Sequence, residues 1–194
     1  MQKAQAELDS VVGAGRLPGF EDQNALPYMQ ALIKEITRWR PIAPTAVAHA
    51  ATENSVYKGL FIPKGSTIYA NNFAILADPE MFPEPDIFKP ERFLDNPDSK
   101  SYKMAFGYGR RMCPGMHIAL QGIYIAISRL LWAFEILPIS ENGKVYMPAA
   151  DDFTGGLVSR PANLKYRLVL RHKGMLDLIM LDAEKADMEA MAWQ

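Results

Sequence analysis

The sequence predicts an α+β fold that is mainly helical, and three of its features support this prediction. Apolar residues recur at helical spacing on either side of residues 45–71. Within residues 45–71, short apolar runs alternate with turn signals such as Lys58-Gly59, which is typical of short strands. Residues 78–99 hold five prolines and show no periodicity, so we expect an irregular meander there.

Two helices are expected before the strands. Residues 2–12 are typical of the end of a helix, which Gly13 and Gly15 close. The next helix has Pro27 in its first turn and ends before Pro41. Its apolar residues at helical spacing are Leu32, Ile33, Ile36 and Trp39.

Short extended segments are expected at residues 45–51, 56–57, 61–62 and 67–69. A short helix should follow at Asn72–Leu76. In the meander, three aromatic side chains are expected to anchor the irregular backbone to the core, namely Phe82, Phe88 and Phe93.

A long helix is expected after Gly115, and its predicted apolar face consists of Leu120, Ile123, Ile127, Leu130, Leu131 and Phe134. Residues 118–139 are the most hydrophobic stretch, but they include Arg129 and Glu135, so we expect a buried core helix instead of a bilayer span. Hairpin strands are expected within residues 145–170 around Gly155-Gly156. Residues 1–173 are predicted to form one partial domain, and residues 174–194 a tail or surface helix.

The composition excludes several classes of protein. The chain has 194 residues, is 49% hydrophobic and carries a net charge of −1, which gives no electrostatic reason to expect nucleic acid as a partner. It holds one cysteine and three histidines, so neither an intrachain disulfide nor a structural zinc cluster is expected. No signal peptide or membrane anchor is expected in this chain.

A glycine-rich loop at residues 106–115 surrounds the single cysteine, Cys113. Pro114 suits the first position of the helix that follows, and the positive end of that helix favours an anionic sulfur. The glycines allow backbone N–H groups to approach the sulfur closely. Such a thiolate suits haem iron, and Arg111 could pair with a haem propionate. The alternative is a small buried cysteine with no metal.

Five positions of this loop match a known pattern: Phe106, Gly109, Arg111, Cys113 and Gly115. The pattern resembles the F-x-x-G-x-R-x-C-x-G signature of the cytochrome P450 family. Glu35 and Arg38 match that family's E-x-x-R helix motif, and Arg92 matches the residue that completes a network with them. The resemblance therefore implies the C-terminal part of the cytochrome P450 fold, most like its fungal microsomal members.

The resemblance also implies roles for individual residues. Cys113 would be the axial metal ligand to the iron of haem b, within a cofactor site formed by Arg111, Phe106, Gly109 and Gly115. His49 would contact a haem propionate, or would be an exposed histidine on a strand. His117 is expected to pack or to lie at the surface, because it follows Cys113 by one helical turn and cannot be a second axial ligand.

Residues 43–47 and 153–158 resemble the family's two late substrate-lining segments. The apolar candidates in them are Ala46, Val47, Leu157 and Val158, which would suit a small apolar substrate. Ordinary strand core is the alternative interpretation.

The implied activity is that of a monooxygenase, which inserts one oxygen atom from O2 into an apolar organic substrate. Electrons would come from NADPH through an NADPH-cytochrome P450 reductase, and full-length relatives are endoplasmic reticulum membrane proteins that face the cytoplasm. No catalytic residue is assigned, because no segment matches the family's oxygen-activating helix. The alternative is a non-catalytic fragment that binds haem weakly; peroxide-driven or isomerising haem-thiolate chemistry is a third possibility.

Overall fold

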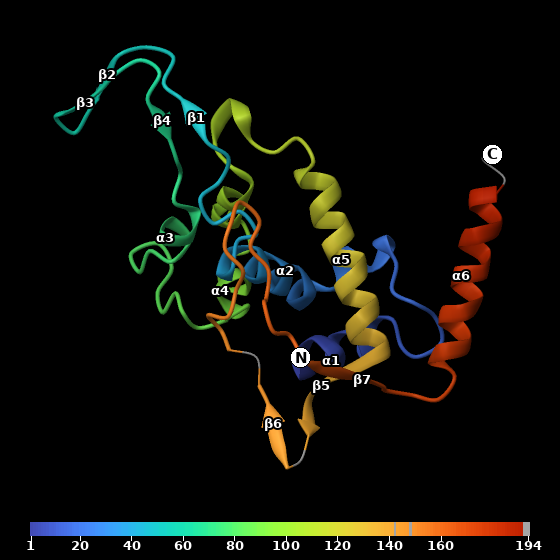
Figure 1. Ribbon diagram of the computed structural model, residues 1–194. Coiled ribbons are helices and arrows are strands. Elements are labelled where there is room, and N and C mark those ends of the chain that lie inside the picture. Colours follow the sequence, from blue (N-terminus) through green and yellow to red (C-terminus); the bar gives the residue numbers. More distant parts are fainter. Residues whose placement is uncertain (142, 148, 192–194) are drawn as a thin grey trace. The chain divides into compact units, whose positions relative to one another are not determined.

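The computed structural model describes residues 1–141, 143–147 and 149–191 (Figure 1). The chain forms two compact units. The first unit comprises residues 1–33, 117–150 and 163–194, and the second comprises residues 34–116 and 151–162.

The first unit begins with helix α1 (Gln2–Val11), the short 3-10 helix η1 (Phe20–Ala25) and the start of helix α2 (Pro27–Trp39). The carboxylate of Glu7 accepts hydrogen bonds from the N–H groups of Tyr28 (2.8 Å) and Met29 (2.9 Å). These N–H groups have no partner inside the helix, so α1 caps α2 with a negative charge at its positive end. Both helices were predicted, and both are confirmed within one residue.

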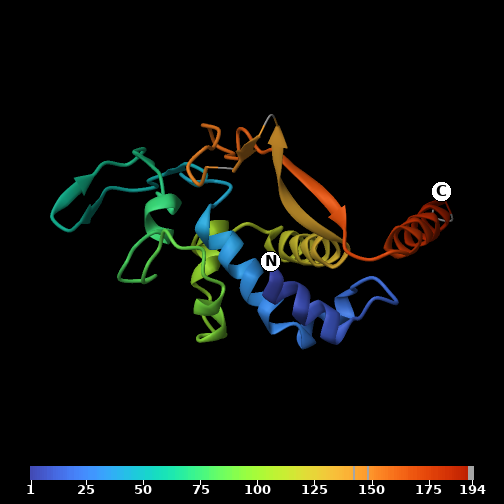
Figure 2. The ribbon, with the colours of Figure 1, turned by 90° about the horizontal axis from the view of Figure 1, so that it is seen from below.

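Helix α5 (Met116–Ala133) is shorter than predicted, because Phe134 already begins strand β5 (Phe134–Glu141). Strand β5 is the centre of an antiparallel sheet with the order β6-β5-β7, in which β6 is Lys144–Tyr146 and β7 is Tyr166–Leu170. Figure 2 shows β5 and β7 side by side. Pro138 cannot continue a helix, and periodicity alone does not separate a short apolar strand from a buried helix.

The predicted hairpin around Gly155-Gly156 is also wrong in its main part. Strands β6 and β7 both pair with β5 instead of with each other. Near the two glycines, the structure has only the isolated bridge between Phe153 and Pro161 within the residues described. The common partner of β6 and β7 is β5, which lies before residues 145–170, where the hairpin was expected.

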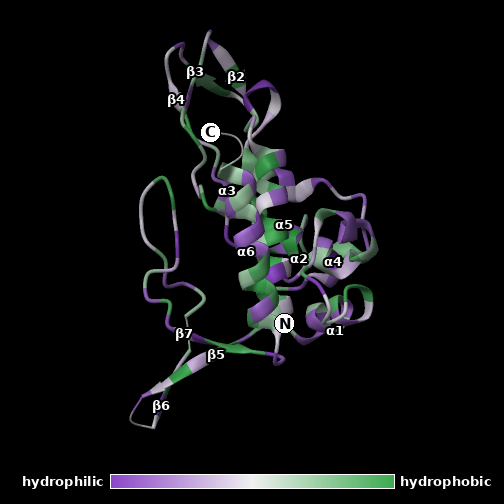
Figure 3. Cartoon of the chain, turned by 90° about the vertical axis from the view of Figure 1, so that its right-hand side faces the viewer, coloured by the Kyte–Doolittle hydropathy of each residue, from purple (hydrophilic) through white to green (hydrophobic). Residues whose placement is uncertain are grey.

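The predicted apolar face of α5 is only partly correct, because Leu131 is buried whereas Leu120, Ile123, Ile127 and Leu130 are half-buried. Tyr124 and Trp132 are buried, and their polar atoms donate to the carbonyl oxygens of Gly19 (2.9 Å) and Gly13 (2.7 Å). Helix α5 is long and apolar enough to cross a membrane, but the core helices of soluble proteins meet the same criteria of length and composition. Only 33% of α5 is buried. The prediction of a buried core helix is therefore only partly correct; Figure 3 colours the chain by hydropathy and shows both green and purple segments around the labels of α5 and α6.

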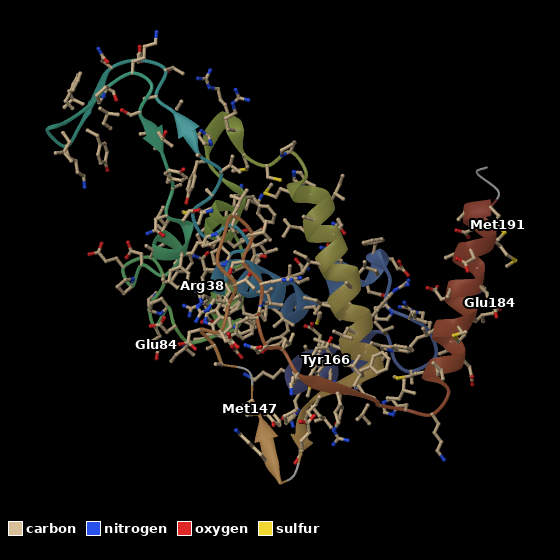
Figure 4. All side chains as sticks on the ribbon, in the orientation of Figure 1. Arg38, Glu84, Met147, Tyr166, Glu184 and Met191 are labelled. Atoms are coloured by element: carbon tan, nitrogen blue, oxygen red, sulfur yellow. The ribbon has the colours of Figure 1, made fainter. Side chains whose placement is uncertain are left out.

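The C-terminal helix α6 (Met175–Met191) agrees with the predicted surface helix. Met175 is buried, whereas Glu184 and Met191, labelled in Figure 4, are exposed. The ion pair between Arg129 and Asp182 (2.7 Å) joins α6 to α5. The last three residues of the predicted tail, 192–194, lie outside the described residues, and the domain boundary at residue 173 stays a prediction.

The second unit contains two small antiparallel strand pairs. Strand β1 (His49–Ala50) pairs with β4 (Thr67–Ile68), and β2 (Ser55–Tyr57) pairs with β3 (Leu60–Ile62). The turn between β2 and β3 has positive φ at both Lys58 (48°) and Gly59 (81°), as a two-residue hairpin turn of the primed type requires. In Figure 1 the β1–β4 pair lies between this hairpin and helix α3 (Asn72–Leu76).

The meander of the second unit is irregular, as predicted, with one short helix, α4 (Glu91–Leu94). Phe82 and Phe93 are buried and anchor it, whereas Phe88 is exposed, contrary to expectation. The Phe88 ring instead packs edge-on against Trp39, with 5.5 Å between the ring centroids. The 3-10 helices η2 (Ser101–Phe106) and η3 (Gly109–Arg111) then lead to the cysteine loop.

Candidate functional site

A buried ion pair links Glu35 and Arg38 on α2. Their side chains are 0% and 1% exposed, and they form two hydrogen bonds, from Arg38 Nε to Glu35 Oε2 (2.8 Å) and from Arg38 Nη2 to Glu35 Oε1 (2.9 Å). Residues i and i+3 lie on the same side of a helix, so the spacing in sequence already permits this pair. Figure 4 shows Arg38 among closely spaced side chains.

Arg92 joins this pair from the meander. Its Nε lies 3.2 Å from the Glu35 carboxylate, while its terminal nitrogens donate to the carbonyl oxygens of Pro83, Glu84 and Ile87. The backbone N–H of Lys89 also donates to Glu35 Oε1 (2.9 Å). One carboxylate therefore holds two guanidinium groups and a backbone donor, and the network joins α2 to the irregular meander.

Arg38 extends the network to two further carbonyl oxygens. Its Nη1 donates to Leu76 O (2.8 Å) and its Nη2 to Pro85 O (2.9 Å). The guanidinium also lies 5.3 Å from the centre of the Phe82 ring. A buried ion pair needs such additional partners to offset the loss of hydration, and here they come from α3 and the meander.

The cysteine loop turns sharply at two glycines. Gly107 and Gly109 have φ values of 95° and 57°, a region that favours glycine. The N–H of Cys113 donates to Phe106 O (2.8 Å) and closes the loop. The side chain of Cys113 is exposed, so the alternative of a small buried cysteine does not hold.

Helix α5 begins directly after Gly115, as predicted, but Pro114 does not take its first helical position. Pro114 lies in a turn, which the bond from Met116 N–H to Cys113 O (3.3 Å) closes, and the helix starts at Met116. A Cβ at Gly115 would lie 3.8 Å from the sulfur of Cys113. Glycine at position 115 therefore adds no side chain of its own beside the sulfur.

Arg111, His49 and His117 are exposed. Within the described part of the chain, no hydrogen bond or ion pair joins the side chain of Arg111 or of either histidine to another residue. The Arg111 guanidinium is therefore available to an external anion.

The two predicted substrate-lining segments lie next to each other. The N–H of Ser159 donates to Ile42 O (2.8 Å) and joins them. Ala46 is buried, whereas Val47, Leu157 and Val158 are each more than half exposed. A cavity of about 140 Å³ lies between the segments, and its lining includes Arg40, Pro44, Phe73 and Phe153.

Two residues at the site have no counterpart among the predicted ones. The hydroxyl of Tyr108 donates to Asn72 Oδ1 (2.8 Å), and Asn72 Nδ2 donates to Ala43 O (3.3 Å). Burial raises the pKa of Tyr108. The spacing of the two residues in sequence gives no signal of this contact, because it is set by the tertiary fold.

The site contains few groups that could hold a metal ion. Across residues 1–141, 143–147 and 149–191, no three side chains of His, Cys, Asp or Glu come together as a metal site. A metal at Cys113 would therefore have to bring most of its ligands with it, as the iron of a porphyrin does.

Comparison with known proteins decides the family. The sequence model described as Cytochrome P450 matches residues 1–168. The chain belongs to the cytochrome P450 family. Its structure also resembles that of a zebrafish cytochrome P450 solved with abiraterone, with a TM-score of 0.77 and 33% identity over 88% of this chain and 39% of that chain. The predicted partial cytochrome P450 fold is thereby confirmed.

Curated fungal relatives show the same family. Cytochrome P450 monooxygenase drtD of Aspergillus calidoustus is 47% identical over 85% of this chain and 31% of its own length. Cytochrome P450 monooxygenase 58 of Postia placenta is 43% identical over 88% of this chain and 34% of its own length. The chain thus spans about a third of the length of these relatives.

Proposed function

We propose that this chain forms the cysteine-ligand side of a haem-thiolate monooxygenase, in which Cys113 is the axial ligand of the iron. The observation that carries the proposal is the cysteine loop. It presents an exposed sulfur next to a glycine, and the bond from Cys113 N–H to Phe106 O holds its backbone closed. An exposed sulfur, with no Cβ at Gly115 beside it, suits a flat macrocycle.

The other residues of the proposed cofactor site have supporting roles. Arg111, exposed and without a partner in the described chain, would donate to a haem propionate. His49, exposed on β1, would also contact a haem propionate. Phe106 supplies the carbonyl that closes the loop, Gly109 permits a turn at positive φ, and Gly115 adds no side chain beside the sulfur.

Bound haem b would supply O2 binding and activation, with one oxygen atom transferred to the substrate. Among the chain's own residues, Glu35, Arg38 and Arg92 would position the meander and would not touch the reacting atoms. No residue is assigned to proton delivery. The electrons would come from an NADPH-cytochrome P450 reductase at the cytoplasmic face of the endoplasmic reticulum.

The proposed substrate is small and apolar. Ala46 and Val47 lie on one segment and Leu157 and Val158 on the other, and the bond from Ser159 N–H to Ile42 O joins the chain beside these two segments. Apolar side chains dominate most small-molecule sites, where a few polar groups fix the orientation. These side chains would contribute one wall of such a site.

A second candidate is a chain that binds haem weakly and does not turn over substrate. The exposure of Val47, Leu157 and Val158 favours it, because more than half of each residue faces solvent. Turnover separates the two candidates. With haem, reductase, NADPH and an apolar substrate, the first predicts a product labelled from isotopically labelled O2, which Cys113→Ala abolishes. Bound haem without labelled product would favour the second.

A further inference from the structure

Asn72 lies at the start of α3 and binds the cysteine loop. Its side chain is 0% exposed, and its amide has one partner for each polar atom: Nδ2 donates to Ala43 O and Oδ1 accepts from the Tyr108 hydroxyl. The donation to a carbonyl fixes which end of the amide is the oxygen. The contact with Tyr108 therefore has a defined direction, in which Tyr108 donates and Asn72 accepts.

The opposite end of α3 binds the buried ion network. The carbonyl of Leu76, the last residue of the helix, accepts from Arg38 Nη1 (2.8 Å). The N–H of Phe73 also donates to Pro44 O (3.0 Å). A helix of five residues is too short to be stable alone, so these tertiary bonds determine where α3 lies. The network and the cysteine loop are thus attached to opposite ends of one small element.

The cysteine loop has few other attachments. Tyr108 stands between Gly107 and Gly109, which both have positive φ and lose much conformational freedom when the loop is ordered. Among residues 107–112, all of which the structure describes, Tyr108 is the only one whose side chain forms a hydrogen bond. The Tyr108 hydroxyl therefore forms the side-chain hydrogen bond that anchors this loop.

We propose that Asn72 and Tyr108 are positioning residues for the axial cysteine, and that they connect the loop of Cys113 to α3 and so to the Glu35–Arg38–Arg92 network. The proposal rests on the proposed function, because it takes Cys113 as the iron ligand. The pair keeps the bond from Cys113 N–H to Phe106 O closed and thereby fixes the direction of the sulfur. Neither residue touches the reacting atoms.

The first measurement uses the haem-free chain. Because Cys113 is the only cysteine, isotope-labelled cysteine gives a single backbone amide signal, whose hydrogen exchange reports the opening of the bond to Phe106. Tyr108→Phe should speed this exchange about fivefold, which corresponds to about 1 kcal/mol for one hydrogen bond. The matched control is Tyr102→Phe, because Tyr102 lies in η2 and its hydroxyl has no hydrogen-bond partner within the described chain.

A double variant tests the pair itself. Asn72→Ala should speed the exchange at least as much as Tyr108→Phe, and the double variant should be no faster than Asn72→Ala alone, because the same bond is already lost. Equal exchange in Tyr108→Phe and Tyr102→Phe would overturn the proposal. Additive effects in the double variant would overturn it as well.

The second measurement uses the haem-loaded chain and its reduced carbon monoxide complex. In Tyr108→Phe, a smaller share of the complex should show the thiolate-type Soret band, whereas Tyr102→Phe should match the wild type. An unchanged share would overturn the positioning role. If the wild type itself shows no thiolate-type band although the exchange effect is present, the proposed function fails, and with it the claim that the pair positions an iron ligand.

Discussion

Replacing Glu35 by glutamine tests how much the buried network stabilises the second unit. The Glu35 carboxylate accepts two hydrogen bonds from Arg38, one from Arg92 and one from the N–H of Lys89. Gln is nearly the same size, so the substitution removes the negative charge and leaves two guanidinium groups beside a neutral amide. The NH2 group of the glutamine amide can only donate hydrogen bonds, and it would face the N–H donors of the arginine guanidinium groups.

The expected loss of stability is large. Breaking a buried ion pair by removing one partner costs about 3–5 kcal/mol, because the remaining charge is left buried without compensation. The whole free energy of unfolding of a domain is about 5–15 kcal/mol. With a urea dependence of about 2 kcal/mol per molar, Glu35→Gln should lower the midpoint of urea unfolding by about 1.5–2.5 M.

The assay is urea unfolding followed by tryptophan fluorescence, since Trp39 lies on the same helix as Glu35. The control is Glu53→Gln, which removes the same charge from an exposed side chain and should shift the midpoint by less than about 0.3 M. If both variants have the same midpoint, the network does not stabilise the fold as its geometry implies.

Three further predictions concern a loop glycine, a helix glycine and an acidic side chain. Gly107→Ala should lower the free energy of unfolding by about 1 kcal/mol or more, because the φ of 95° at this position strains any other residue. Gly122→Ala in α5, where a Cβ meets nothing within 4 Å, should raise the free energy of unfolding by about 0.5–1 kcal/mol. The hydrogen bond from Arg16 lowers the pKa of Asp22 below its ordinary value of 3.8. The stabilisation by the Asp22 carboxylate is therefore present above pH 3.8 and is lost as the pH falls through the folded pKa. The free energy of unfolding should thus fall less steeply with decreasing pH in Asp22→Asn than in the wild type. An unchanged slope would refute this.

Local signals in the sequence predicted much of the fold. Pro27 and Pro41 bound α2 because proline fits a helix start and interrupts a continuing helix. The Lys58-Gly59 turn follows from the need for positive φ in a tight hairpin. The contact between Glu35 and Arg38 follows from helical spacing, although the backbone partners at Lys89 and Pro85 do not.

The errors arose where tertiary pairing decides the structure. Helix α5 ends at Ala133 because the next eight residues pair with β6 and β7, which a periodicity count over one segment does not detect. Phe88 packs against Trp39 at the surface instead of in the core. The bond between Asn72 and Tyr108 joins residues 36 positions apart, and neither side chain alone indicates it.

The most direct test of Cys113 as the axial ligand is the reduced carbon monoxide spectrum of the haem-loaded chain. We expect incomplete occupancy at equimolar haem, so the spectrum is taken at saturating haem for the wild type, Cys113→Ala and His117→Ala. The account predicts a thiolate-type Soret band in the wild type and in His117→Ala, and none in Cys113→Ala. A band that survives Cys113→Ala, or a histidine-type band that His117→Ala abolishes, would contradict it.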